Sequence, residues 1–116
     1  MLNVMPQIYT ELSTIGIPVS AEGSKTKEVV YPCITYRNDN DIQDLTGDTL
    51  GYSNVYYTIK VWAHRISDLQ IYAVKIDKVM RSLGFVRTST NEIWADDLGQ
   101  KLLRYRALGL ESFMEE

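Results

Sequence analysis

The spacing of apolar residues along the chain predicts two amphipathic helices. The first spans Leu2 to Ile15 and ends at Gly16, with an apolar stripe formed by Val4, Met5, Ile8, Tyr9, Leu12 and Ile15. The second spans Ser67 to Gly84, where Ser67 and Gln70 fit a capping box and Gly84 fits the left-handed position after a helix. Its apolar positions are Leu69, Tyr72 or Ala73, Ile76, Val79 or Met80, and Leu83. Each helix therefore has one face to bury against a sheet.

Between the helices, residue types and alternation predict strands. Ile17 to Ala21 forms a short extended segment, and Val29 to Arg37 is rich in β-branched and aromatic residues. Pro32 confines the latter strand to a sheet edge or marks a strand start. The clearest strand is Tyr52 to His64, whose apolar face carries Val55, Tyr57, Ile59, Val61 and Ala63.

The segment after the second helix predicts a β-meander. We expect strands at Phe85 to Ser89, Glu92 to Asp96 and Lys101 to Glu111, with turns at Thr90-Asn91 and Asp97-Leu98-Gly99. The order helix, strands, helix, strands predicts an α+β fold, with an antiparallel or mixed sheet and two main helices layered on one face. A length of 116 residues suits a single domain, 1–116.

The second face of the strand Tyr52 to His64 is unusually aromatic. Tyr56 and Trp62 flank Lys60 on this face, and we expect Trp94 to join them. Several exposed aromatic side chains exceed the apolar patch that a monomer normally tolerates. These four residues are therefore predicted to contact another subunit or a partner. The alternative is that each helix covers one face of the sheet.

A polar loop is predicted from Asn38 to Gly51. It carries four aspartates, Asp39, Asp41, Asp44 and Asp48. They do not form a calcium-binding loop, because the required glycine at the sixth position and glutamate at the twelfth are missing. We expect these carboxylates to line a lumen or meet a partner's basic surface, or else to belong to a solvated loop without contacts.

Charge and residue inventory narrow the function classes. The net charge is -3 and the 12 basic residues are scattered, which disfavours general binding to a nucleic-acid backbone. One cysteine, Cys33, and one histidine, His64, are too few for a Cys/His zinc site, and no phosphate-binding glycine loop is present. A catalytic pair of these two residues is arithmetically possible, but a buried apolar cysteine is the simpler interpretation. We predict no enzymatic activity, cofactor or metal, no membrane insertion and a cytosolic location.

Several segments together resemble a known family. They are the strand YPCITY, the polar loop, the strand YTIKVWAH, the helix beginning near SDLQIYAVKIDKVM and the closing strand KLLRYRAL. In this order they resemble the small tail-completion proteins of siphophages and prophages, the tail-terminator and head-tail joining group, over about Met1 to Leu108. The resemblance implies a non-enzymatic structural subunit that assembles with itself, often as a hexameric ring, between tail-tube and head-connector proteins. It also implies the host cytoplasm as the place of assembly and the virion tail or neck as the destination.

Two other functions remain open. The aromatic strand face could stack bases in a small nucleic-acid-binding or regulatory module, because aromatics interleaved with cations can do so. An enzyme using Cys33 and His64 is the third possibility. The acidic net charge and the residue inventory rank both below a tail-assembly subunit.

Overall fold

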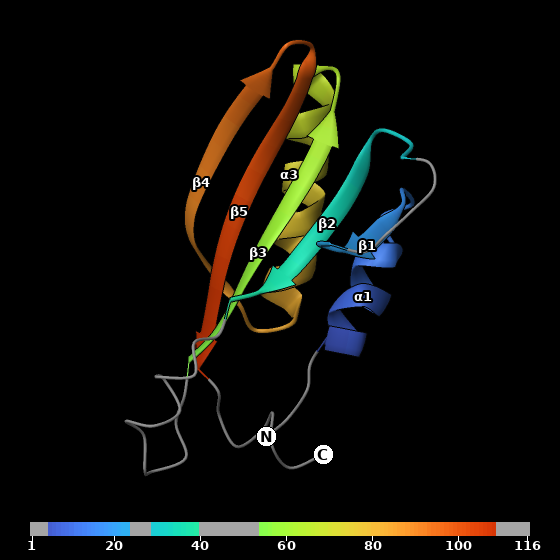
Figure 1. Cartoon of the computed structure of the whole chain (residues 1–116). Coiled ribbons are helices and arrows are strands. Elements are labelled where there is room, and N and C mark those ends of the chain that lie inside the picture. The colour runs from blue at the N-terminus through green and yellow to red at the C-terminus, as the bar shows by residue number, and fades with distance from the viewer. Residues whose placement is uncertain (1–4, 24–28, 40–53, 109–116) are drawn as a thin grey trace.

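The fold is an α+β arrangement of one five-stranded sheet and two helices, as the sequence predicts (Figure 1). The computed structural model describes residues 5–23, 29–39 and 54–108. Along the chain the elements are α1 (Met5–Ser13), β1 (Val19–Ala21), β2 (Cys33–Asn38), β3 (Asn54–Ala63), α3 (Ile66–Ser82), β4 (Val86–Ala95) and β5 (Leu98–Leu108). The strand order is β1-β2-β3-β5-β4, with β1 parallel to β2 and every other pair antiparallel. The sheet is therefore mixed.

Both helices pack on the same face of the sheet. α3 lies against β3 and β5, and α1 lies against β1 and α3 (Figure 1). One apolar core joins them, and its fully buried side chains include Ile8, Leu12, Ile34, Tyr57, Ile59, Val61, Leu69, Ile76, Met80, Leu103 and Tyr105. The alternative in which each helix covers its own face is therefore wrong. Within the described parts of the chain, neither helix has the length and apolarity needed to cross a bilayer.

The end of α3 follows the sequence prediction, whereas its beginning does not. Gly84 has a φ of +94°, its N–H donates to the carbonyl of Arg81 and the next N–H, of Phe85, donates to Met80, which together form a Schellman cap. The predicted capping box is wrong because the helix begins at Ile66, one residue earlier than Ser67. The N-cap residue is then Arg65, whose side chain makes no capping hydrogen bond.

α1 is shorter than the predicted helix in the part that the structure describes. Ile8 and Leu12 are fully buried and Ile15 packs on the core, but Val4 lies outside the described residues. Tyr9 is 48% exposed, so it does not widen the buried stripe as expected. Gly16 has a φ of +104°, which fits its predicted role in ending the helix.

The neighbourhood of Pro32 resolves the choice between an edge strand and a strand start. Pro32 immediately precedes β2, and the peptide bond before it is cis. Because β2 is hydrogen-bonded to both β1 and β3, it is an interior strand. The missing N–H of proline therefore lies outside the ladder.

The predicted β-meander is wrong, because the C-terminal segment forms one long hairpin. β4 continues through Thr90 and Asn91, the expected turn, and pairs with β5 over its whole length. The reversal occurs at Asp96 and Asp97, where Asp96 has a φ of +57°, a conformation that aspartate tolerates. Leu98, expected in that turn, already belongs to β5. Two strands thus replace the three that were predicted.

Candidate functional site

Register places Tyr56, Lys60 and Trp62 on the open face of the sheet, the face opposite the helices. Their neighbours at i±1 on β3, including Tyr57 and Val61, are fully buried against the helices. The three residues thus lie on the face that the sequence predicts, and their role as an interface stays a prediction. All three are only partly exposed, so this face is not the bare aromatic surface that the sequence suggested.

Trp94 lies on the other face, contrary to prediction. It pairs with Gly99, which in turn pairs with Ala63 on the helix-covered side of β3. The indole lies over Gly99 so closely that a Cβ there would approach the ring to 2.7 Å and Leu69 of α3 to 2.9 Å. A turn at Asp97-Leu98-Gly99, as predicted, would pair Trp94 with Leu102 on the open face, whereas the observed reversal at Asp96 and Asp97 pairs it with Gly99. The two tryptophans are therefore on opposite sides of the sheet.

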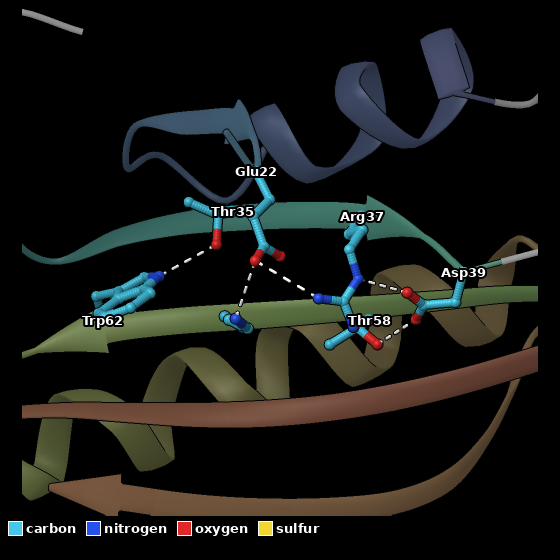
Figure 2. A network of polar contacts seen from close by, with 7 residues as sticks. Glu22, Thr35, Arg37, Asp39, Thr58 and Trp62 are labelled. Atoms are coloured by element: carbon cyan, nitrogen blue, oxygen red, sulfur yellow. Dashed lines mark hydrogen bonds and ion pairs between the residues drawn. The ribbon is translucent and has the colours of Figure 1, made fainter. Parts of the chain in front are cut away.

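A polar network covers the open face of β2 and β3 (Figure 2). The carboxylate of Glu22, just after β1, accepts from Lys60 Nζ at 3.2 Å and faces Arg37 Nη1 at 3.5 Å. Asp39 joins the two strands, because one of its oxygens accepts from Arg37 Nε and the other from the hydroxyl of Thr58. Thr58 is fully buried although it lies on the open face. The hydrogen bond to Asp39, together with the charges of Asp39 and Glu22, raises the pKa of Arg37 above its ordinary value, although desolvation acts in the opposite direction.

Trp62 is held by the same face. Its indole N–H donates to the hydroxyl of Thr35 at 3.1 Å (Figure 2). Lys60 Nζ lies 5.9 Å from the centre of its ring. The ring also forms one wall of a cavity of about 400 Å³ beside β1. The other residues lining it are Pro18, Val19, Ser20, Ala21, Glu22, Gly23, Val29, Val30, Tyr31, Cys33 and Thr35. The predicted interface positions thus have internal partners.

The predicted acidic loop lies only partly within the described residues. Asp39 is drawn into the polar network described above and does not point away from the sheet toward a lumen (Figure 2). Asp41, Asp44 and Asp48 lie outside the described residues. Their role as a lumen or partner loop stays a prediction.

The exposed surface of β4 is the feature that sequence reasoning missed. Among the strands that the structure describes, β4 lies at an edge of the sheet with β5 as its one neighbour, and all ten of its residues are exposed. They include three large apolar side chains, Val86, Ile93 and Trp94, at 61%, 47% and 41% exposure. The signal in the sequence was a run of Thr and Ser, residues compatible with an exposed strand, which we interpreted as a strand end and a turn.

A groove lies between α3 and β4 on the helix side of the sheet. It has a volume of about 380 Å³, and the residues lining it include Val74, Lys78, Arg87, Thr90 and Lys101. The groove exists because α3 covers β3 and β5 and leaves β4 largely uncovered (Figure 1). Its lining is mixed in charge.

Asp77 lines this groove and contacts three neighbouring side chains. It accepts from the hydroxyl of Tyr105 at 3.0 Å and from Arg81 Nε at 2.7 Å, and it lies 3.6 Å from Arg87 Nη1. Burial, followed by the charge of Asp77, raises the pKa of Tyr105 far above its ordinary value. The phenol therefore stays protonated and acts as a hydrogen-bond donor that ties β5 to α3.

Cys33 pairs with Trp62, two residues before His64, but the contacts of the two side chains differ. His64 Nδ1 lies 3.1 Å from the backbone oxygen of Asp97, and its ring packs edge-on against Tyr31 at 5.2 Å. Cys33 is buried, and desolvation raises its pKa, which disfavours the reactive thiolate. In the part of the chain that the structure describes, no group of three or more His, Cys, Asp or Glu residues could hold a metal ion.

The most distinctive candidate site is thus the exposed edge strand β4 with the groove beside it, rather than the aromatic face. Backbone groups at a free strand edge can pair with another strand, and the flanking side chains choose the partner. Comparison with known proteins finds no matching family model and no curated sequence with significant similarity.

Proposed function

We propose that this protein is a structural assembly subunit that associates with copies of itself and, as the resemblance of its segments implies, completes a phage or prophage tail. In this role it caps the tail tube or joins the tail to the head connector as a ring. The observation that carries the proposal is the edge strand β4, which is exposed at all ten positions.

A free edge of this length favours association. Monomeric proteins usually shorten, cover or charge their edge strands, because an unpaired row of backbone groups recruits other strands. Here β4 is long, and its central part from Thr88 to Asn91 is uncharged. Exposed Val86, Ile93 and Trp94 lie on the same strand. A second strand pairing there would satisfy the backbone and cover this apolar surface.

The order of elements also supports the tail-completion role. The fold has the α+β order of a helix, strands, a second helix and closing strands that the resemblance implies. Agreement in fold is consistent with a family, but a fold does not by itself specify function. The self-association step is therefore the part that the geometry supports most directly.

Base stacking on the open face has less support. Lys60 and Arg37 are paired with Glu22 and Asp39, so the cations next to the aromatic rings are already neutralised. The indole N–H of Trp62 is engaged by Thr35. A stacking platform for single strands needs aromatics and cations that are open to the ligand.

Light scattering after size-exclusion chromatography, over a concentration series of the full chain, tests the proposal. We expect the mass to rise with concentration to a closed assembly, which negative-stain electron microscopy would show as a ring. A mass that stays monomeric up to the solubility limit contradicts self-assembly. Tight binding to a fluorescent single-stranded oligonucleotide that weakens steeply with salt would instead favour the nucleic-acid function.

A further inference from the structure

We propose that β4 pairs antiparallel with β4 of a second copy, about a two-fold axis that passes through Thr90. The two sheets then become one continuous sheet. This inference rests on the proposed function in one respect, namely that the partner is a second copy of the same chain. It goes further by specifying the strand, its direction and its register.

The two edges of the sheet offer very different partners. β1, at the far edge, has three residues, whereas β4 has ten. A strand the length of β4 finds an equally long free edge, within the described elements, only in another β4. Pairing of identical edges is closed and uses the same surface on both copies, as in most dimers.

The register of β4 against β5 shows that β4 is symmetric about Thr90. Thr90 pairs with Leu103, and the β5 partners run in single steps from Arg106 to Gln100 on either side. A bulge between Arg87 and Ser89 leaves Thr88 out of the pairing with β5. Arg87 therefore lies two pairing steps from Thr90 instead of three. The equidistant pairs are Ser89 and Asn91 at one step, Arg87 and Glu92 at two steps, and Val86 and Ile93 at three steps.

These equidistant pairs are chemically complementary. Two-fold pairing through Thr90 sets Arg87 of each copy opposite Glu92 of the other, on the side of the sheet that carries the helices. It sets Val86 opposite Ile93 on the open side. Opposite charges and apolar side chains in direct cross-strand positions are stabilising, and each such pair occurs twice in the dimer.

Neighbouring registers lose this complementarity. Centring the axis on Ser89 or on Asn91 separates Arg87 from Glu92 and replaces the pairs with mismatched ones. Within its own chain Arg87 lies 3.6 Å from Asp77, whereas Glu92 lies 3.5 Å from Lys101 and accepts from the indole N–H of Trp94 at 2.8 Å. Both residues remain exposed despite these contacts, so each can also meet a charge from a second copy. Charge complementarity therefore selects both the partner and the register.

The helices do not take part in this contact. α3 packs over β3 and β5, so the two copies of α3 would stand about four strand spacings apart, or about 19 Å. Packed helices approach to about 8–10 Å. Val74, which is 60% exposed on α3 beside the groove, is thus outside the joint and serves as a control position.

Disulfide trapping tests the axis directly. Cys33 is the only cysteine, so Cys33→Ala gives a background without thiols. In that background we expect Thr90→Cys to cross-link with itself under mild oxidation, because directly opposed Cβ atoms lie about 4.5–5.5 Å apart. Val86→Cys and Ile93→Cys should cross-link with each other when mixed and not when oxidised separately. Val74→Cys should remain uncross-linked.

Charge reversal tests the register independently. Arg87→Glu alone and Glu92→Arg alone should each weaken dimerisation about tenfold in sedimentation equilibrium, because each creates two like-charge contacts per dimer. The double variant should return to within about threefold of the original, since the pair is restored with its signs exchanged. Lys75→Glu, on the exposed side of α3, is the matched control. Thermal melts of each variant check that the fold survives.

The outcomes separate this inference from the proposed function. Self-association without cross-linking at Thr90, and without rescue in the double variant, overturns the β4 pairing and leaves the assembly function standing. Cross-linking at Thr90 in a particle that stops at the dimer supports the pairing and contradicts the ring. A strict monomer in which Thr90→Cys does not cross-link overturns both.

Discussion

The strands β2 and β3 differ from the edge strand β4 in where their side chains find partners. Around β2 and β3, Glu22, Arg37, Asp39 and Lys60 bond to one another, and even Thr58 on the open face is fully buried. Along β4, every residue is exposed, and the oppositely charged Arg87 and Glu92 lie at equal distances from the strand centre. The contacts of β2 and β3 stabilise the monomer, whereas β4 is exposed and is, in our proposal, the strand that meets another chain. A charged side chain near an aromatic ring is therefore a weaker sign of an interface than an unpaired strand.

The largest expected difference in stability is between the same substitution, Ile to Ala, made in β2 and in β4. Ile34→Ala in β2 removes a fully buried side chain and should lower the free energy of unfolding by about 2–5 kcal/mol. Ile93→Ala in β4 removes a side chain that is 47% exposed and should change it by less than about 0.5 kcal/mol. Urea unfolding at low protein concentration measures both. Equal losses in the free energy of unfolding would contradict the view that β2 stabilises the monomer and β4 does not.

High pH should loosen the interior without acting on β4. Burial raises the pKa of Tyr57 on β3 to about 12, and that of Tyr105 is raised as well. Because the unfolded chain ionises first, stability should be constant below about pH 10 and then fall by about 1.4 kcal/mol per pH unit for Tyr57 until the folded-state pKa is reached. Urea unfolding as a function of pH measures this slope. Tyr57→Phe should reduce the slope to the part that Tyr105 contributes, and an unchanged slope in that variant would refute the assignment.

Two threonines give a smaller contrast. Thr58→Val removes the hydroxyl that donates to Asp39 and should cost about 1 kcal/mol of stability. Thr88→Val removes a weaker bond of 3.3 Å to the carbonyl of Arg104 at an exposed site and should cost less than about 0.5 kcal/mol. Thr58→Ser, which keeps a hydroxyl, controls for the change in shape. A greater loss at Thr88 would show that the bulge, and not the polar network, is the stabilising feature.

The smallest expected effect is that of salt on self-association. If Arg87 and Glu92 of two copies meet at the exposed joint, raising the salt from about 0.1 M to about 1 M shortens the screening length from about 10 Å to about 3 Å. The dissociation constant should then increase a few-fold, as sedimentation equilibrium would show. In the variant Arg87→Glu, the same change in salt should strengthen association, because it screens repulsion. The same sign in both proteins would contradict the proposed register.

Most of the fold could be predicted from local patterns. The alternation in Tyr52 to His64, the apolar stripe after Ser67 and the glycines at 16 and 84 correctly placed a strand, a helix and two helix ends. These signals work because the buried face repeats with the period of the element. The burial of residues on the open face, such as Thr58, depends on neighbours distant in sequence and left no local pattern.

The errors came from the part of the chain with the least burial. Thr90 and Asn91 have turn-like chemistry, but pairing with β5 keeps them in a strand. The predicted turn at Asp97-Leu98-Gly99 shifts the register of β4 by an odd number of residues, which puts Trp94 on the wrong face. The candidate edge could not be predicted, because whether a strand has one neighbour or two is a property of the whole sheet.

The uncharged stretch from Thr88 to Asn91 affects how readily the free protein aggregates. Free strand edges can seed fibrils when they are apolar and lack charge. In β4 the central side chains are small and polar, and the charged Arg87 and Glu92 flank them in the way that gatekeeper residues flank aggregation-prone segments. If β4 pairs as proposed, these flanking charges let the strand remain uncovered without aggregating until it meets a second copy.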